Sequence, residues 1–312
     1  MLTDSKIKAI TDLAMELECL VMYDEPMAKH STFKVGGPAR VMIDVNSLQS
    51  AAKLIKAAGE TGVRYLTLGN GSNLLFDDRG FDGVVLVMGS SVDGIEMKNE
   101  TTITAQAGCS LLKLCRFALE HSLTGLEFAY GIPGTVGGAI FMNAGAYGGE
   151  IKNVIKQVRS VAADGTLRDT AGSDLDMYYR HSCFMETGDL ILEGTFVLTP
   201  GNYDDIQDRM VDLMGRRRDK QPLNFPSAGS VFKRPGEQIY AGKLIQDSGL
   251  RGYSIGGAQV SEKHCGFIVN KGGATCEDIL ALIKYVQKTV QEKTGYLLEC
   301  EVRYIPFEEN ET

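Results

Sequence analysis

The 312-residue sequence lacks the short signatures of the commonest metal and nucleotide sites. Its seven cysteines are scattered and never spaced C-x-x-C, and its four histidines form no H-E-x-x-H, so neither a disulfide framework nor a zinc site is indicated. No G-x-x-x-x-G-K-[ST] is present, and the segment GNGSNL at 69–74 has leucine where G-x-G-x-x-G requires its third glycine. The P-loop and Rossmann modes of phosphate binding are therefore excluded.

Long apolar runs and an excess of positive charge are also missing. No apolar run reaches the ~18 residues that would cross a bilayer, and the first residues, MLTDSK, do not resemble a secretion signal, so we expect a cytoplasmic protein without a membrane partner. The net charge of −8 argues against nucleic-acid binding, which depends on Lys and Arg. A monomer is compatible with the sequence, which does not fix the oligomeric state.

Glycine, by contrast, is concentrated in one stretch. Residues 125–149 hold eight of the 36 glycines, where an even spread would place about three. The same stretch contains Ile132, Pro133, Ile140 and Phe141, so it is too apolar for a linker and too glycine-rich for an ordinary element. It predicts a buried loop system around a flat or anionic ligand, with backbone N–H groups as anion nests. A purely structural set of turns is the alternative.

Hydrophobic periodicity predicts a mixed chain. We expect strands at 40–45, 65–68, 83–88, 101–107, 155–163, 190–198, 265–269 and 297–305, and helices at 6–20, 47–58, 110–120, 204–218, 241–247 and from residue 275 onward. Thr275 and Asp278 have the spacing of a capping box. The first two strands and the helix between them form a β-α-β unit that leads into the loop 69–73, and ligands bind at this end of parallel strands.

Seven segments together match one family. They are 30–37 (HSTFKVGG), 69–73 (GNGSN), 132–139 (IPGTVGGA), 143–148 (NAGAYG), 179–184 (YRHSCF), 228–233 (AGSVFK) and 256–260 (GGAQV). From about residue 30 to 305 the chain resembles the UDP-N-acetylenolpyruvoylglucosamine reductase (MurB) family of peptidoglycan precursor synthesis. The interval from Phe184 to Gly201 is too short for the tyrosine insertion of the longer branch, so the chain resembles the shorter, type II branch.

The resemblance implies an α+β fold. It consists of a two-lobed FAD-binding domain of the vanillyl-alcohol-oxidase (PCMH) type, followed by a smaller α/β substrate-binding domain. We expect a lead-in at 1–29, the FAD-binding domain at 30–200 with lobes at about 30–90 and 91–200, and the C-terminal domain at 201–312, with the boundary near Pro200 and Gly201.

The implied activity is a hydride relay. NADPH, as co-substrate, reduces non-covalent FAD, and the hydride then passes to the enolpyruvyl double bond of a UDP-sugar enolpyruvyl ether, UDP-N-acetylglucosamine enolpyruvate, to give UDP-N-acetylmuramate. Other flavin oxidoreductases of the same fold that tether FAD covalently often use a histidine in the glycine-rich loop, and 69–73 contains none. Two rivals stay open: another non-covalent FAD oxidoreductase acting on a hydroxy acid or sugar alcohol, and a nucleotide-binding module without chemistry.

The resemblance assigns three catalytic residues. Arg180 would bind the substrate carboxylate, Ser230 would donate the proton, and Glu301 would act as a polarising or proton-relaying partner. Each has an ordinary alternative: a surface arginine, a turn serine that bonds its own backbone, and a solvated charged face that Glu301 shares with Glu299 and Arg303 if the last strand is regular.

It also implies two sets of binding residues. The FAD contacts would be Thr32, Gly69, Asn70, Gly71, Ser72, Asn73, Ile132, Pro133, Gly134, Thr135, Gly137, Gly138, Ala139, Asn143, Gly145 and Tyr147. The uridine diphosphate contacts would be Lys220, Lys233, Arg234 and Gln259. Cations at the end of a helix are by default a solvated face, and Tyr130 and Tyr147 could equally pack in the core.

Overall fold

The computed structural model describes residues 2–308 of the chain. Residue 1 of the expected lead-in and residues 309–312 of the expected C-terminal domain lie outside the described part. The first lobe is a four-stranded sheet in the order β1-β2-β5-β3. Its strands are β1 (Leu20–Pro26), β2 (Pro38–Asp44), β5 (Phe81–Val87) and β3 (Tyr65–Leu68). The strands β2, β5 and β3 are parallel, and β1 is an antiparallel edge.

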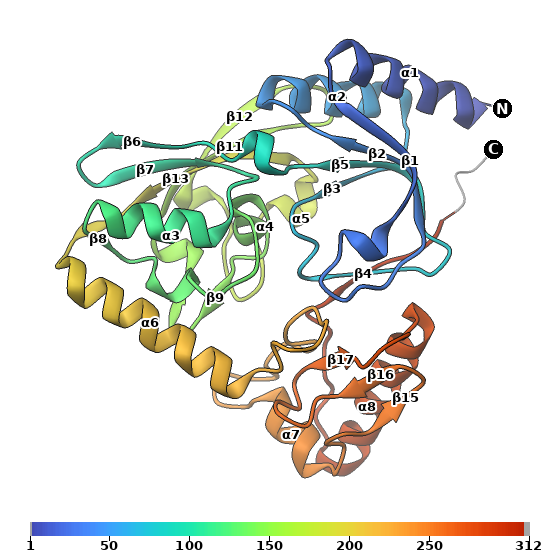
Figure 1. Cartoon of the computed structure of the whole chain (residues 1–312), viewed down its shortest axis with the longest axis vertical. Coiled ribbons are helices and arrows are strands. Elements are labelled where there is room, and N and C mark those ends of the chain that lie inside the picture. Colours follow the sequence, from blue (N-terminus) through green and yellow to red (C-terminus); the bar gives the residue numbers. More distant parts are fainter. Residues whose placement is uncertain (1, 309–312) are drawn as a thin grey trace.

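Two helices, α1 (Leu2–Glu16) and α2 (Leu48–Thr61), lie side by side over this sheet (Figure 1). The local sequence determines both ends of α2. The Ser47 hydroxyl accepts a hydrogen bond from the Ser50 N–H, and Gly62 closes the helix in the left-handed region at φ 64°. The buried stripe of α2 runs through Ala51, Leu54, Ile55 and Ala58 and packs into the core.

The second lobe is a five-stranded antiparallel sheet in the order β12-β11-β13-β7-β6. Its strands are β12 (Leu167–Ala171), β11 (Ile155–Val161), β13 (Leu190–Val197), β7 (Thr102–Gln106) and β6 (Ile95–Asn99). The helices α3 (Leu111–Glu120) and α4 (Val136–Phe141) belong to this lobe, and α4 contacts β13 and β7. One continuous core of buried apolar side chains extends through both lobes, from Ile7 to Met210.

A long helix, α6 (Tyr203–Lys220), runs beneath α3 toward the C-terminal part of the chain (Figure 1). That part holds a three-stranded sheet, β15 (Ser254–Ile255), β16 (Ala258–Val260) and β17 (Ile268–Asn270), together with α7 (Ala241–Asp247) and α8 (Cys276–Thr294). Its core also takes in Phe33, Val35 and Leu75 from the first lobe, so apolar packing joins the two regions. The expected boundary near residue 200 stays a prediction.

The last strand, β18 (Arg303–Ile305), leaves the C-terminal part and pairs in parallel with β4 (Leu74–Phe76) (Figure 1). The remaining short elements are η1 (Met27–Lys29), η2 (Ser90–Val92), β8 (Leu123–Thr124), η3 (Glu127–Ala129), β9 (Gly145–Ala146), β10 (Gly149–Glu150), η4 (Ile151–Asn153), η5 (Gly172–Asp174), α5 (Phe184–Thr187) and β14 (Thr199–Pro200). No helix in residues 2–308 is long and apolar enough to cross a membrane.

Three expectations about the elements were wrong. The first helix ends at Glu16 instead of residue 20, because Glu18 turns the chain at φ 57° and Leu20 begins β1, whose backbone is paired with β2. The strand expected at 265–269 lies at 268–270. The closing strand is regular only from Arg303, since residues 297–302 hold a single bridge, from Cys300 to Phe232.

The glycine-rich stretch is also more regular than expected. It contains the short helix α4, and the Thr135 hydroxyl at its start accepts a hydrogen bond from the Gly138 N–H. The rest of the stretch is loops, short 3-10 turns and two-residue strands. The capping box of α8 is confirmed: the Asp278 N–H donates to the Thr275 hydroxyl, and the Thr275 N–H donates to the Asp278 carboxylate.

Candidate active site

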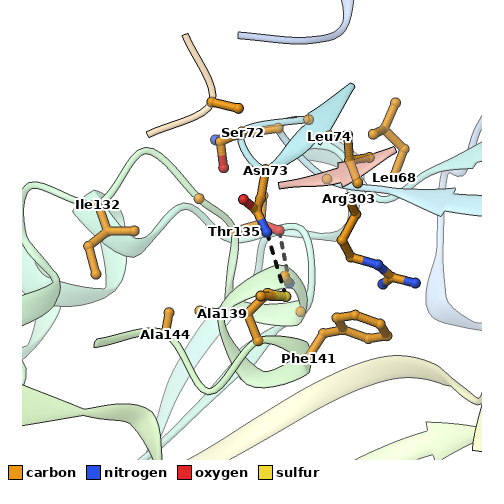
Figure 2. A pocket seen from close by; sticks show the side chains of 18 of the residues that line it. Leu68, Ser72, Asn73, Leu74, Ile132, Thr135, Ala139, Phe141, Ala144 and Arg303 are labelled. Atoms are coloured by element: carbon orange, nitrogen blue, oxygen red, sulfur yellow. Dashed lines mark hydrogen bonds between the residues drawn. The ribbon is translucent and has the colours of Figure 1, made fainter. Parts of the chain in front are cut away.

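A cavity of about 500 Å³ lies where the two lobes and the C-terminal part meet. One wall is the loop 69–73, the second is the segment 132–146, and the third comes from residues 228–230 and 301–305. Asn73 touches all three, because its amide donates to the Glu301 carbonyl at 3.1 Å and contacts the Met142 sulfur at 3.7 Å. Figure 2 shows Asn73 beside Arg303, whose N–H donates to the Asn73 carbonyl at 3.0 Å.

The loop 69–73 offers unpaired donors to the cavity. Among the described residues, no acceptor receives a hydrogen bond from the backbone N–H groups of residues 70–73. Gly71 is required by its backbone, since φ is 58° and a Cβ there would lie 2.1 Å from the His30 carbonyl oxygen. Buried backbone donors are normally paired, so a row of unpaired N–H groups beside a cavity is suited to an anionic ligand.

The second wall has no side chain at two of its glycines, Gly134 and Gly138, and both border open space. A Cβ on Gly134 or Gly138 would have no neighbouring atom nearer than 3.8 Å and 3.6 Å, respectively, so these glycines leave room instead of filling it. Gly69 does the opposite, because a Cβ there would lie 2.4 Å from the Thr135 hydroxyl. The two glycine-bearing segments therefore touch each other at Gly69 and leave open space beside Gly134 and Gly138.

Arg180 and Glu301 meet at this cavity although the sequence separates them by 121 positions. Nε of Arg180 donates to Oε1 of Glu301 at 2.6 Å, and a second guanidinium nitrogen donates to the Gly145 carbonyl at 3.2 Å. The two side chains are 18% and 14% exposed. Burial raises the pKa of Glu301, and the nearby Arg180 charge opposes that shift.

The alternative of a solvated face for Glu301 is wrong. The chain before it is not a regular strand, so Glu299 and Glu301 do not behave alike: the Glu299 side chain is 73% exposed and pairs with Lys233, whereas Glu301 turns inward. The Glu301 N–H donates to the Val231 carbonyl at 2.7 Å. This contact attaches Glu301 to the segment that carries Ser230.

Ser230 lies on the third wall of the cavity, next to Gly229 at φ 77°. Its backbone forms a bridge with Phe267, and the following N–H, of Val231, donates to the Gly266 carbonyl at 2.9 Å. No hydrogen bond from the Ser230 hydroxyl to a described residue is present, so the hydroxyl is free to meet a ligand in the cavity. The three residues expected to be catalytic are thus brought together at one cavity.

Most of the expected FAD contacts also line the cavity, and three do not. Thr32 lies behind the loop 69–73, where its N–H donates to the Gly71 carbonyl and its buried hydroxyl has no partner among the described residues. Asn143 is fully buried, and its side chain bonds Glu150, the Tyr178 carbonyl and the Lys152 N–H. Tyr147 is 39% exposed and lies outside the cavity lining.

None of the four expected diphosphate contacts lines the cavity. Lys233 pairs with Glu299 at 2.6 Å, and the Gln259 amide donates to the Gly252 carbonyl and the Ser254 hydroxyl. Arg234 stacks over the Tyr240 ring, and Lys220 is the exposed last residue of α6.

Sequence reasoning missed two cavity arginines, Arg217 and Arg303. Neither has a carboxylate partner among the described residues, and burial lowers the pKa of both. Arg217 lies four and seven positions after Leu213 and Met210, and this spacing places it on the buried face of α6. The spacing was visible in the sequence, but a charged residue at the end of a helix is usually interpreted as solvent-exposed. The Arg303 guanidinium carbon lies 4.5 Å from the centre of the Phe141 ring. Figure 2 shows the two side chains next to each other.

Two family models match separate parts of the chain. The family model "FAD binding domain" matches residues 39–171, and the model "UDP-N-acetylenolpyruvoylglucosamine reductase, C-terminal domain" matches residues 221–305. The UDP-N-acetylenolpyruvoylglucosamine reductase of Agathobacter rectalis is 48% identical over 310 residues, covering 96% of this chain and 98% of that protein.

The chain belongs to the UDP-N-acetylenolpyruvoylglucosamine reductase family. The reductase of the same name from Clostridium botulinum strain Hall is 50% identical over 290 residues, covering 93% of this chain and 94% of that one. A solved member of the family, from Thermus caldophilus, has a TM-score of 0.78 at 30% identity and covers 92% of this chain and 99% of its own. The expected α+β fold, the FAD cofactor and the oxidoreductase class are confirmed.

Proposed function

We propose that this chain catalyses the NADPH-dependent reduction of UDP-N-acetylglucosamine enolpyruvate to UDP-N-acetylmuramate. The observation that carries the proposal is the meeting of Arg180, Glu301 and Ser230 at the cavity of an FAD-binding fold. An enolpyruvyl ether needs a cation for its carboxylate and an acid for one carbon of its double bond, and these three residues supply both. The same fold acting on a hydroxy acid would need a base instead, and the Glu301 carboxylate at this cavity is held as the partner of Arg180.

The cavity wall is suited to FAD. The unpaired N–H groups of residues 70–73 would hold the diphosphate, and the open faces of Gly134 and Gly138 would let a flat ring approach the backbone. When bound, FAD supplies the hydride that NADPH has delivered to it. We propose non-covalent binding, since the loop 69–73 contains no histidine.

Arg180 is proposed to hold the substrate carboxylate. Two of its three nitrogens are used, by Glu301 and Gly145, and the third has no partner among the described residues. When hydride adds to one carbon of the double bond, negative charge spreads onto the carboxylate, and a fixed cation stabilises that charge. Glu301 keeps the guanidinium oriented, because its carboxylate accepts from Nε.

Ser230 is proposed to protonate the second carbon of the double bond. Its hydroxyl has no acceptor among the residues that the structure describes, so the proton is available to the ligand. A serine is a very weak acid, and the alkoxide left behind needs a cation or a donor nearby. Lys233 and Arg234 follow Ser230 closely in the chain, and we keep them, with Lys220 and Gln259, as the proposed contacts to the uridine diphosphate.

The test is Ser230→Ala, with Ser227→Ala from the same loop as the matched control. We expect NADPH to reduce the flavin of both variants at the wild-type rate. Reoxidation by the enolpyruvyl substrate should fall by about 10²- to 10⁴-fold in Ser230→Ala alone, the usual contribution of a positioned proton donor. Normal reoxidation of this variant would rule out the serine, and a wild-type flavin that the substrate cannot reoxidise would rule out the function.

NADPH and nucleotide sugars are cytoplasmic metabolites, so the proposed reaction belongs to the cytoplasm. There it would supply a peptidoglycan precursor for wall growth, cell shape and cell division.

A further inference from the structure

The proposed catalytic residues come from two regions of the fold, whose relative position must be fixed for the residues to act on one substrate. Arg180 belongs to the segment that follows η5 in the second lobe, whereas Ser230 and Glu301 belong to the C-terminal part. One contact between these regions is the Arg180–Glu301 ion pair at 2.6 Å. A second is made by Tyr179, whose hydroxyl accepts a hydrogen bond from the Arg234 N–H at 3.2 Å.

Tyr179 touches the proposed carboxylate-binding group directly. The Arg180 guanidinium carbon lies 5.0 Å from the centre of the Tyr179 ring, within the range of a cation–π contact. Arg180 also has an unfavourable backbone, with φ at 57°, which a non-glycine residue adopts only when its surroundings hold it there. The ring of Tyr179 is therefore one of the groups that fix the position of the guanidinium.

The partner of Tyr179 is attached to the proposed proton donor. Arg234 lies just before a turn that is closed by a bridge between Gly236 and Ile239. Just before it, the Lys233 N–H donates to the Glu299 carbonyl at 2.8 Å, and Phe232 bridges Cys300. The segment from Ser230 to Arg234 is thus fixed to the chain that leads into Glu301, and the Tyr179 hydroxyl binds its far end.

We propose that Tyr179 is a positioning residue that keeps the Arg180 guanidinium in register with Ser230. Its ring supports the guanidinium of the second lobe, and its hydroxyl holds the Ser230–Arg234 segment of the C-terminal part. The inference rests on the proposed function. Tyr179 should therefore matter for the reoxidation of the flavin by the enolpyruvyl substrate, in which Arg180 and Ser230 act on the same molecule. The reduction of the flavin by NADPH should not depend on it.

The experiment separates the hydrogen bond from the ring. Tyr179→Phe keeps the ring and loses the hydroxyl, and Tyr179→Leu loses both. Tyr178→Phe and Tyr178→Leu are the matched controls, since Tyr178 is 54% exposed and its ring stacks on His181. For each purified holoenzyme, FAD content, the rate of flavin reduction by NADPH, and KM and kcat for the enolpyruvyl substrate are measured.

We expect kcat/KM for the enolpyruvyl substrate to fall by about 3- to 10-fold in Tyr179→Phe, the effect of one neutral hydrogen bond. Tyr179→Leu should lose about 10- to 100-fold, because the contact with the guanidinium is lost as well. The rate of flavin reduction by NADPH should stay within about twofold of wild type in both Tyr179 variants, since that step does not need Arg180 and Ser230 to act together. Both Tyr178 variants should stay within about twofold of wild type in both half-reactions, since they leave the relative position of Arg180 and Ser230 unchanged.

Two results would overturn the proposal. The first is a Tyr179→Phe enzyme with wild-type kcat/KM, which would mean that the hydrogen bond to Arg234 positions nothing. The second is a parallel loss of FAD content and of both half-reactions, which would make Tyr179 a general packing residue. Failure of the proposed function is distinguishable from either, because the wild-type flavin would then not be reoxidised by the substrate at all.

Discussion

The Arg180–Glu301 pair allows the most quantitative test of the site. The perturbation is a double-mutant cycle of Glu301→Gln, Arg180→Met and the two together. Glutamine keeps the size of the side chain and removes its charge. The contact is 2.6 Å long and its side chains are 18% and 14% exposed, so solvent screens it less than a surface pair.

A hydrogen bond to a charged group contributes about 1.5–3 kcal/mol. Since each 1.36 kcal/mol is tenfold in rate, Glu301→Gln should slow flavin reoxidation by the enolpyruvyl substrate by about 10- to 150-fold. Arg180→Met should cost more, because it also removes the cation that the carboxylate binds. The double variant should be no slower than Arg180→Met alone, because residues that act as a unit are not additive.

The assay is anaerobic mixing of the NADPH-reduced enzyme with substrate while flavin absorbance is followed. Glu299→Gln is the control, since Glu299 lies two positions away and is 73% exposed, and we expect it to stay within about twofold of wild type. Losses that simply add in the double variant, or a Glu301→Gln enzyme as fast as wild type, would refute the reasoning.

The pH profile of the same reaction gives an independent check on Glu301. Burial raises the pKa of its carboxyl, so the ion pair with Arg180 is complete at high pH and is lost as pH falls through that raised pKa. The wild-type rate should therefore decline on the acid side at a higher pH than an ordinary glutamate would produce. Glu301→Gln, which has no such proton to gain, should lack this acid limb.

Two further variants test the cavity and the contact between the regions. Arg303→Met should weaken FAD binding about tenfold or more in a fluorescence titration, because the cavity loses an unpaired cation. Arg64→Met is its control, since Arg64 also lies over a phenylalanine ring but does not line the cavity, and an Arg303→Met enzyme that binds FAD as tightly as Arg64→Met would contradict this expectation. Asp78→Ala should lower the unfolding temperature by several degrees, since its carboxylate accepts from the first two N–H groups of α8 at 2.8 and 3.1 Å, worth about 1–2 kcal/mol. An unchanged melting curve would show that water replaces this cap.

The elements that sequence reasoning predicted well are those whose ends depend on local chemistry. The helix α2 begins at the Ser47 cap and ends at Gly62, and α8 begins at the Thr275 capping box. The strand β1 was missed because Leu17 and Leu20 continue a helical spacing, and only the pairing of Leu20 with Asp44 explains why the helix stops earlier. That pairing depends on residues far away in the chain.

In the site, too, the features that depend on local sequence were predicted, and those that depend on contacts between distant residues were not. The glycine-bearing loops were visible in the sequence because their composition is local and unusual. The inward turn of Glu301 could not be read from alternation, since the Glu301 N–H is held by Val231, far back in the sequence. Arg217 lies among the charged residues Arg216, Arg218 and Lys220, whose default interpretation is a solvated face, so the helical spacing that places it on the buried face of α6 was overlooked.

The parallel pairing of β18 with β4 has a consequence for how the protein matures. Asn73 at the start of β4 binds the carbonyl of Glu301, which the ribosome adds 228 positions later. During synthesis, the loop that would hold the cofactor phosphates therefore lacks this neighbour until residue 301 has emerged. We therefore expect flavin to bind only after this contact has formed, and chains that stop before residue 301 to be released without bound flavin.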